Sequence, residues 1–235
     1  ANNLLNFFIK NSGVKKATRI LNVACGYGSE TFAYYQKFKP EMIEGIDITK
    51  LHVDYANDKA KLLKLDKVIK FYHGDACNLD FPPNSFSHVF GIEGPANFNT
   101  REKFFKSAYK VLEKGGELIL TDIILGKNFD NRKKFKKMLV AFAAKGWVAP
   151  KANWVDEEGY KKQLEKTGFS VIFLKKIGDK VLPGYANYCS NSKTIKKIKS
   201  ERGISTAMGF TMISLVLGYL YRKGLIDYVY VKARK

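Results

Sequence analysis

Hydrophobic residues in the first half of the chain fall into short runs, and longer amphipathic stretches separate these runs. Short apolar runs that alternate with stretches of helical periodicity are typical of βα units on a parallel sheet. The pattern therefore predicts an α/β fold. The predicted strands are Ile20–Ala24, Met42–Ile46, Val68–His73, Phe86–Ile92 and Glu117–Ile123, with helices between them at Ser29–Phe38, Lys50–Leu63 and Thr100–Leu112.

The second half of the chain is less regular. Its pattern predicts helices at Asn131–Lys145 and Asp156–Lys166, and a sixth strand at Ser170–Leu174. Alternating Tyr and Val residues predict a seventh strand at Asp227–Lys232. Together these elements predict a doubly wound, seven-stranded, mostly parallel sheet.

The connection between the last two predicted strands is unusually long. About 50 residues lie between them, which is more than a simple connection in such a fold needs. We therefore expect a single domain over residues 1–235 that carries a helical cap. Residues about 125–150 and 175–225 are expected to form this cap over the active site.

One part of this insertion, Gly203–Tyr221, contains no charged residue, and its length approaches that of a membrane span. Ser205, Thr206, Thr211 and Ser214 dilute its hydrophobicity, and a predicted sheet strand follows within a few residues. We expect a buried helix beneath the cap. Membrane contact, without a transmembrane span, is the alternative hypothesis.

The formal net charge is +19, from 41 Lys and Arg residues against 22 Asp and Glu residues. Nucleic acid, anionic lipid or an acidic substrate would each be attracted by such a charge. Most of the excess is lysine in scattered pairs, such as Lys15-Lys16 and Lys196-Lys197, and not one arginine-rich block with interleaved aromatic residues. This distribution favours a solvated, lysine-rich surface over a nucleic-acid site.

The three cysteines, Cys25, Cys77 and Cys189, are far apart and form neither a CxxC pair nor a cluster with histidine. This spacing indicates reduced thiols and predicts no metal site. No secretory signal opens the sequence, so a cytoplasmic location is expected.

Glycines follow the first predicted strand, at Gly26 and Gly28. Between a strand end and a helix N-terminus, glycines let a ligand approach the backbone. Asp47, at the end of the second strand, is placed to accept hydrogen bonds from ribose hydroxyls; a helix N-cap is the structural alternative. Nicotinamide and flavin proteins use a similar turn, but Thr31 stands where their third glycine would be. A nicotinamide oxidoreductase is therefore a disfavoured alternative.

Further motifs follow in a defined order. The Gly74–Ala76 turn closes the third strand, Glu93 ends the fourth, and a glycine pair at 115–116 precedes the fifth. In this order and spacing, residues about 18–125 resemble the class I S-adenosylmethionine-dependent methyltransferases. The resemblance is to their small-molecule branch, which includes tocopherol, sterol, sarcosine and natural-product methyltransferases.

This resemblance implies S-adenosylmethionine as the cofactor and assigns roles to particular residues. The first loop would contact the methionine part of the cofactor, and Asp47 would hold the ribose with Ile48 packing on the adenine. Asp75 and Ala76 would contact the adenine edge, and Ile92 would lie near the reactive methyl group. The residues expected to bind the cofactor are Asn22, Ala24, Gly26, Gly28, Asp47, Ile48, His52, Asp75, Ala76 and Ile92.

Two of these positions depart from the family pattern. The family usually has an acidic residue where Asn22 stands and glycine where Ala24 stands. Asn22 removes a charge that would help to hold the amino group of the cofactor, and Ala24 would narrow the loop. Both departures concern affinity for the cofactor more than the fold.

Glu93 is the best candidate for a general base, because it ends a strand in the crevice where such folds bind ligands. A role in orienting the substrate or the cofactor is the alternative. Phe98, Tyr185 and Tyr188 are expected to line the substrate pocket together with Glu93. The expected substrate is a small molecule, anionic or lipid-like in character.

Two other functions stay open as alternatives. Enzymes that methylate a base usually carry a polar residue, Pro-Pro and an aromatic at the end of the fourth strand. Glu93-Gly94-Pro95-Ala96 stands there instead, so an RNA or DNA methyltransferase is disfavoured. Asn22 and Ala24 are also compatible with a cofactor-binding module without turnover. Neither the acceptor atom nor the oligomeric state follows from the sequence.

Overall fold

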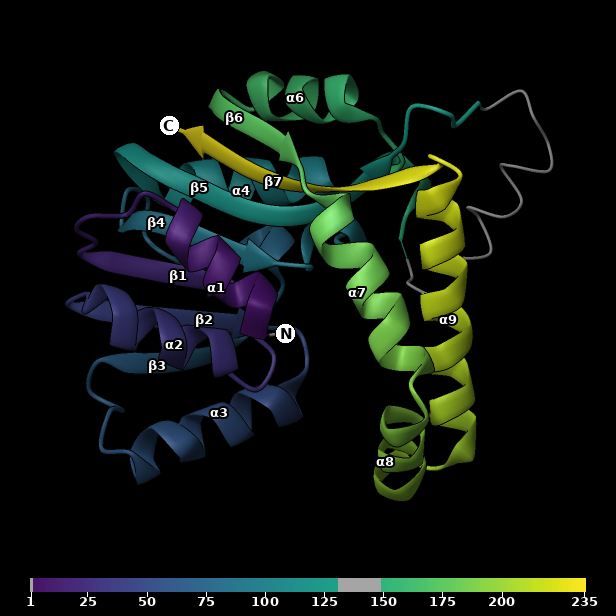
Figure 1. Ribbon diagram of the computed structural model, residues 1–235. Helices are drawn as coiled ribbons and strands as arrows, with labels where there is room; N and C mark the ends of the chain where they lie inside the picture. The colour runs from purple at the N-terminus through teal and green to yellow at the C-terminus, as the bar shows by residue number, and fades with distance from the viewer. Residues whose placement is uncertain (1, 131–148) are drawn as a thin grey trace.

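The computed structural model describes residues 2–130 and 149–235. Within them, seven strands form one sheet in the order β3-β2-β1-β4-β5-β7-β6, and β7 runs antiparallel to both of its neighbours (Figure 1). The predicted seven-stranded, mostly parallel class is confirmed. The strands are β1 (Arg19–Val23), β2 (Met42–Asp47), β3 (Ile69–His73), β4 (Phe86–Ile92), β5 (Leu112–Leu125), β6 (Ser170–Lys176) and β7 (Ile226–Arg234).

Helices cover both faces of the sheet, because successive residues of a buried strand point to opposite sides. In β1, Ile20 packs in the same core cluster as residues of the first three helices, whereas Leu21 packs with the fourth and sixth. α1, α2 and α3 thus cover one face, and α4 and α6 the other (Figure 1). These helices are α1 (Asn2–Asn11), α2 (Ser29–Phe38), α3 (Lys50–Leu62), α4 (Arg101–Val111) and α6 (Glu157–Lys166).

Three features of the fold differ from the sequence-based expectation. α1 was not predicted, yet its Phe8 is fully buried against Tyr34, Phe90 and Tyr230. β5 begins directly after α4, before the glycine pair that was expected to precede it, because its early residues pair with β4. The helix predicted at Asn131–Lys145 lies outside the described residues.

The long insertion between β6 and β7 folds as three helices, α7 (Gly178–Ser190), α8 (Ser192–Arg202) and α9 (Ile204–Arg222), which stand together beside the sheet (Figure 1). α7 escaped prediction because Pro183 and Gly184 lie inside it, and both residue types disfavour a helix. Packing on α9 outweighs that penalty, since the α7 residues Leu182 and Ala186 are buried.

The expectation that Gly203–Tyr221 is a buried helix is only half right. The segment is helical, as α9, and Ala207, Leu217 and Leu220 on one of its sides are buried. Its other side is exposed, because α7 and α8 cover a single side of the helix.

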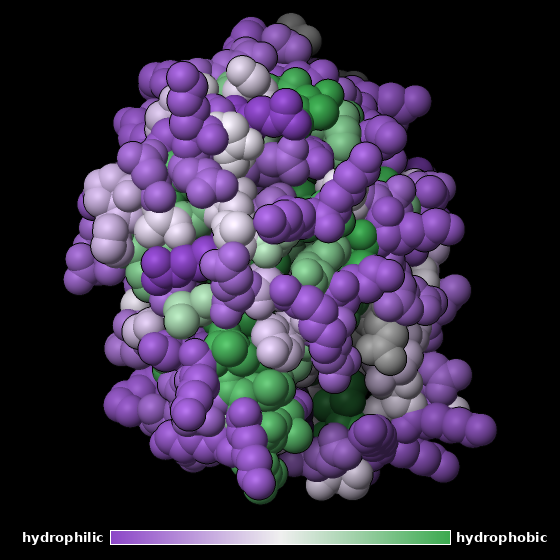
Figure 2. All heavy atoms as spheres, turned by 90° about the vertical axis from the view of Figure 1, so that its left-hand side faces the viewer, coloured by the Kyte–Doolittle hydropathy of each residue, from purple (hydrophilic) through white to green (hydrophobic). Residues whose placement is uncertain are grey.

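Hydrophilic side chains dominate one face of the molecule. Figure 2 shows the side of the molecule opposite α7 and α9, where hydrophilic side chains cover most of the face around a smaller hydrophobic area.

Candidate functional site

The site lies where the order of the strands reverses. β1 has β2 on one side and β4 on the other, so the connections from β1 and from β4 leave in opposite directions. In open α/β sheets, ligands bind in the crevice at the C-terminal ends of the strands at such a switch point. The loops after β1, β2, β3 and β4 meet there.

Asp47 organises the cofactor side of this crevice. Its carboxylate accepts hydrogen bonds from the backbone N–H of Gly26 and of Thr49, both at 2.9 Å, and lies 3.3 Å from Nδ1 of His52. Asp47 does not cap α3, because Thr49 occupies the N-cap position. A buried carboxylate that two backbone amides fix in place keeps lone pairs for the hydroxyls of a ligand.

The turn after β1 needs left-handed backbone conformations. Gly28, the N-cap of α2, has φ +79°, and a Cβ there would lie 2.6 Å from the ring of Phe71. Gly28 is therefore required for close packing, and no cavity described below contacts it. Ala24 has φ +51°, where a residue with a Cβ is strained. A glycine at position 24 would relieve this strain.

Most of the residues predicted to bind the cofactor line one cavity of about 390 Å³, which is called the cofactor cavity below. Asp75, after β3, accepts a hydrogen bond from the Cys77 N–H at 2.8 Å, so its carboxylate also shapes the turn. Ile48 is 71% exposed, which leaves its apolar side chain open to pack on a ring. The predicted site residues that line this cavity are Ala24, Asp47, Ile48, His52, Asp75, Ala76, Ile92, Glu93 and Phe98.

A second cavity of about 260 Å³ adjoins the first, since Ala24 and Ile92 line both. Asn22 lies at its base, where its Nδ2 donates to Oγ1 of Thr31 at 2.9 Å. Gly26 and Glu30 also line this cavity. Glu30, in the first turn of α2, was missed by the sequence analysis, although an acidic residue at a helix start after a glycine turn is a visible signal.

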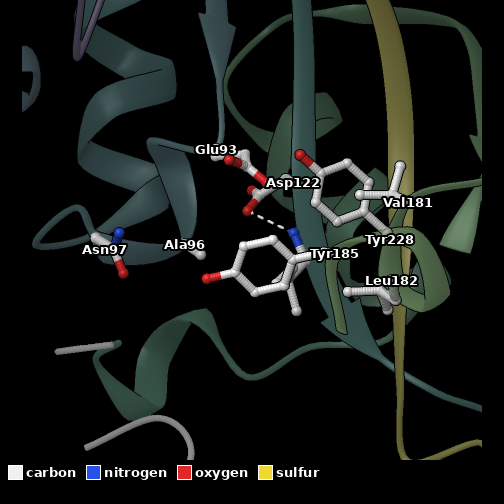
Figure 3. Close-up of a pocket in the computed structure, with 9 residues that line it drawn as sticks. Glu93, Ala96, Asn97, Asp122, Val181, Leu182, Tyr185 and Tyr228 are labelled. Carbon is white, nitrogen blue, oxygen red and sulfur yellow. Dashed lines mark hydrogen bonds between the residues drawn. The ribbon is translucent and has the colours of Figure 1, made fainter. Parts of the chain in front are cut away.

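A third cavity, of about 210 Å³, lies on the other side of Glu93 (Figure 3). α7 contributes Val181, Leu182 and Tyr185 to its wall, and β7 contributes Tyr228. Glu93 and Asn97 line this cavity and the cofactor cavity alike. The carboxylate of Glu93 therefore stands between the two spaces.

Glu93 combines strain with an altered proton affinity. Its φ is +61°, a left-handed conformation that costs energy for any residue with a Cβ and that is common at functional sites. Desolvation by the surrounding protein raises the pKa of Glu93 above its ordinary value, and a hydrogen bond from Tyr228 opposes that rise. A carboxyl whose pKa lies above its ordinary value is better suited to accept and release a proton near neutrality.

Tyr228 was also missed, and three neighbouring strands bring its partners together. Its hydroxyl lies 3.0 Å from Oγ1 of Thr121 on β5 and bonds the carboxylate of Glu93 after β4. Burial raises the pKa of Tyr228 well above its usual value, so the hydroxyl stays protonated and donates to Glu93. The Tyr228 hydroxyl thus lies between Thr121 and the carboxylate of Glu93.

A buried ion pair supports the loop that follows Glu93. Nε of the fully buried Arg101 donates to Oδ2 of Asp122 at 2.8 Å, and the Tyr160 hydroxyl donates to the same oxygen at 3.1 Å. Arg101 also donates to the carbonyl of Asn153 at 2.7 Å, and Asn153 Nδ2 donates to the carbonyl of Phe98 at 2.7 Å. Although Asp122 lines the third cavity, these bonds commit its carboxylate to structure.

The predicted substrate residues divide three ways. Tyr185 lines the third cavity together with Glu93. Phe98 lies on the cofactor cavity instead. Tyr188 is 62% exposed near the end of α7 and lines none of these cavities. The two tyrosines are three positions apart on α7, and Tyr185 is half-buried whereas Tyr188, closer to the end of the helix, is exposed.

No group of three or more His, Cys, Asp or Glu residues that could hold a metal ion occurs in the described part of the chain. Its cysteines are free, and burial raises the pKa of Cys77 to about 11.

The sequence was compared with curated proteins. It is 30% identical to erythromycin 3''-O-methyltransferase of Saccharopolyspora erythraea over 189 residues, which cover 79% of this chain and 61% of the relative. It is 24% identical to sterol 24-C-methyltransferase of Clavispora lusitaniae, over 94% of this chain and 59% of the relative. The chain thus spans about three fifths of the length of these curated relatives.

The fold is shared with a solved structure that contains a product of the cofactor. Geranyl diphosphate C-methyltransferase from Streptomyces coelicolor, in complex with Mg²⁺, geranyl diphosphate and S-adenosyl-L-homocysteine, superposes with a TM-score of 0.81. The two are 15% identical, and the alignment covers 99% of this chain and 80% of that one. At this identity the likeness concerns the fold.

A family model described as a methyltransferase domain matches residues 14–200, a segment that holds the whole crevice from β1 to β5. The turn after β1, Asp47 and the Gly74–Ala76 turn lie within it, in the order that the sequence predicted. The chain therefore belongs to the methyltransferase domain family.

Proposed function

We propose that this chain transfers a methyl group from S-adenosylmethionine to a small acceptor that is lipid-like, anionic or both. One observation carries the proposal: Glu93 and Asn97 line both the cofactor cavity and the third cavity. A carboxylate at the junction of two cavities is where an acceptor would lose its proton as it gains a methyl group. We call the third cavity the acceptor cavity.

The residues of the crevice fit the cofactor. The carboxylate of Asp47 would accept hydrogen bonds from the ribose hydroxyls, and the exposed side chain of Ile48 would pack on the adenine. Glu30 would hold the ammonium group of the methionine part, so it would supply the charge that Asn22 lacks. The adjoining cavities that these residues line provide space for the two halves of the molecule.

The acceptor cavity favours a small apolar molecule. Its wall includes the aliphatic side chains of Val181 and Leu182 and the rings of Tyr185 and Tyr228 (Figure 3). A polynucleotide would need an open groove of basic and aromatic residues, which these residues do not form. Sterols and geranyl diphosphate, after which two relatives are named, combine an apolar body with a polar or anionic end.

The chemistry needs little beyond position and a proton acceptor. When bound, S-adenosylmethionine supplies a methyl group on a positively charged sulfur, which leaves as a neutral thioether. Glu93 accepts the proton that the acceptor atom loses, and Tyr228 holds the carboxylate in place while Thr121 holds Tyr228. The apolar side chains of the acceptor cavity would limit the access of water to this step.

We also place the enzyme in the cytoplasm and in secondary metabolism. The free cysteines support the first statement, because a reducing compartment keeps thiols unpaired. The antibiotic methyltransferase among the relatives supports the second.

The direct test is a transfer assay with a labelled methyl group. The chain is incubated with labelled S-adenosylmethionine and, separately, with tRNA, rRNA, DNA and the small-molecule extract of the source cell. Label confined to the small-molecule fraction is the expected result. Efficient labelling of a nucleic acid would overturn the proposed acceptor, and cofactor binding with no transfer to any fraction would favour a binding module.

A further inference from the structure

α9 exposes a continuous apolar stripe to solvent. Its members recur every three or four residues, so they lie on one side of the helix. On a soluble helix that side is normally polar. The stripe consists of Ile204 (58% exposed), Met208 (67%), Met212 (51%), Leu215 (50%) and Tyr219 (40%).

The opposite side of α9 is already occupied. Ala207, Leu217 and Leu220 are buried, and Gly218 lies so close to α7 that a Cβ would meet Ala186 at 3.0 Å. The stripe is therefore a second apolar side of α9, separate from the side that packs on the protein. Both sides of this helix are apolar, and only one of them packs on the protein.

Basic residues surround the stripe. From residue 192 to residue 223 the chain carries seven Lys or Arg residues and one acidic residue, Glu201. Four exposed lysines lie on α8, just before the stripe begins, and Arg222 and Lys223 follow its end. The α8 lysines are Lys193, Lys196, Lys197 and Lys199.

This combination selects one kind of partner. A second copy of the chain would bring another charge of +19 and another α8 against the first, so like charges would oppose the contact. A nucleic acid would pair with the lysines but would leave the methionine and leucine side chains unsatisfied. An anionic lipid surface satisfies both, because a helix can bury its apolar side at the headgroup boundary while basic residues contact the headgroups.

α9 is also long and apolar enough to cross a bilayer, by length and composition alone. Two observations argue for lying on the membrane instead. α9 packs along α7, where a Cβ on Gly218 would meet Ala186, and four residues after Arg222 the chain enters β7, which pairs with β5 on one side and β6 on the other. A crossing would have to break those contacts.

We infer that α9 and α8 form a docking surface for anionic membranes, with the stripe of α9 inserted at the lipid interface and the lysines of α8 on the headgroups. The inference does not depend on catalysis. If the proposed function holds as well, α7 links the docking surface to the acceptor cavity. It lines the cavity with Leu182 and packs on α9 with Ala186. A lipid-like acceptor would then enter from the surface on which the enzyme is docked.

Vesicle flotation with the whole chain tests the surface. Vesicles of phosphatidylcholine alone are compared with vesicles of equal parts phosphatidylcholine and phosphatidylglycerol, at low and at high salt. Binding to the anionic vesicles, reversed by salt, is the expected result. Equal binding to both kinds of vesicle, no binding to either, or binding that high salt cannot release would overturn the inference.

Two pairs of variants assign the binding to residues. Met208→Ser with Met212→Ser should weaken binding at least about tenfold, because each methionine loses apolar contact with lipid. Leu62→Ser with Leu63→Ser changes two exposed residues at the end of α3 and should leave binding unchanged.

The contribution of the α8 lysines is tested with a matched control as well. Lys196→Gln, Lys197→Gln and Lys199→Gln together should weaken binding at least about tenfold, whereas Lys64→Gln, Lys67→Gln and Lys70→Gln should not. Circular dichroism confirms that each variant is folded, and light scattering measures its mass. A dimer that the Met208 and Met212 changes dissociate, without vesicle binding by the parent chain, would assign the stripe to self-association and overturn the inference.

Discussion

The cofactor side and the acceptor side of the site differ in how far apart in the sequence their contacting residues lie. On the cofactor side, Asp47 bonds the amides of Gly26 and Thr49, which lie 21 and 2 positions away in the sequence. On the acceptor side, Thr121 bonds Tyr228 across 107 positions. The cofactor side is therefore made of turns that follow strands, and the acceptor side depends on distant elements that pack together. A change on the acceptor side should consequently cost fold stability, whereas a change on the cofactor side should cost affinity.

The largest effect should come from the ion pair under the acceptor side. Arg101→Met leaves the carboxylate of Asp122 buried without its partner, and loss of one member of such a pair costs about 3–5 kcal/mol of unfolding free energy. Chemical denaturation monitored by circular dichroism measures the loss. Lys103→Met, on the exposed side of α4, should change stability by no more than about 0.5 kcal/mol. Equal effects of the two changes would show that the pair does not hold the acceptor side together.

Asp47→Ala should reduce affinity for the cofactor and not the stability of the fold. It removes charge-assisted hydrogen bonds to the ribose, so binding of S-adenosylmethionine should weaken by about 2–3 kcal/mol. Isothermal titration calorimetry measures the affinity. Asp54→Ala serves as the control, because Asp54 forms an ion pair with Lys50 on the exposed side of α3, away from the crevice. Unchanged affinity in the Asp47 variant would remove the ribose assignment.

Glu30→Gln tests a second contact on the cofactor side. If Glu30 holds the ammonium group of the methionine part, loss of its charge should weaken cofactor binding by about 1–2 kcal/mol. The same change should hardly affect binding of adenosine, which lacks that group. Glu41→Gln, on the exposed turn before β2, is the matched control. A loss that is equal for the cofactor and for adenosine would assign Glu30 to the shape of the loop.

Tyr228→Phe should shift a pH profile more than a maximal rate. The hydrogen bond from Tyr228 lowers the pKa of Glu93, against the larger rise caused by burial, so its removal raises that pKa further. A general base works above its pKa, so the acid limb of kcat/KM should move to higher pH by up to about one unit. Tyr109→Phe, on the far side of α4, should leave the limb in place. A limb that stays in place in the Tyr228 variant would show that Tyr228 does not set the pKa of Glu93.

The same difference in range explains what the sequence could predict. Strands and turns after β1, β2 and β3 follow from local periodicity and glycine positions, so Asp47, Ile48 and Asp75, which line one cavity, could be singled out as candidates from the sequence. Tyr228 and Arg101 could not, because their roles arise only when β7 and β5 pair and when Asn153 reaches α4.

The insertion shows a second limit of local patterns. α7 contains Pro183 and Gly184, so its helical state depends on packing against α9. An apolar run likewise does not reveal how many of its sides will be covered. Gly203–Tyr221 was therefore predicted as a helix, whereas the exposure of one of its sides was not.

The kinetics of Glu93→Gln test most directly the central claim that Glu93 joins the two halves. The glutamine keeps the shape of the side chain but cannot accept the proton of the acceptor. We predict that turnover falls about 100-fold while calorimetry shows nearly unchanged affinity for S-adenosylmethionine. Wild-type turnover, or a loss confined to cofactor affinity, would contradict the account.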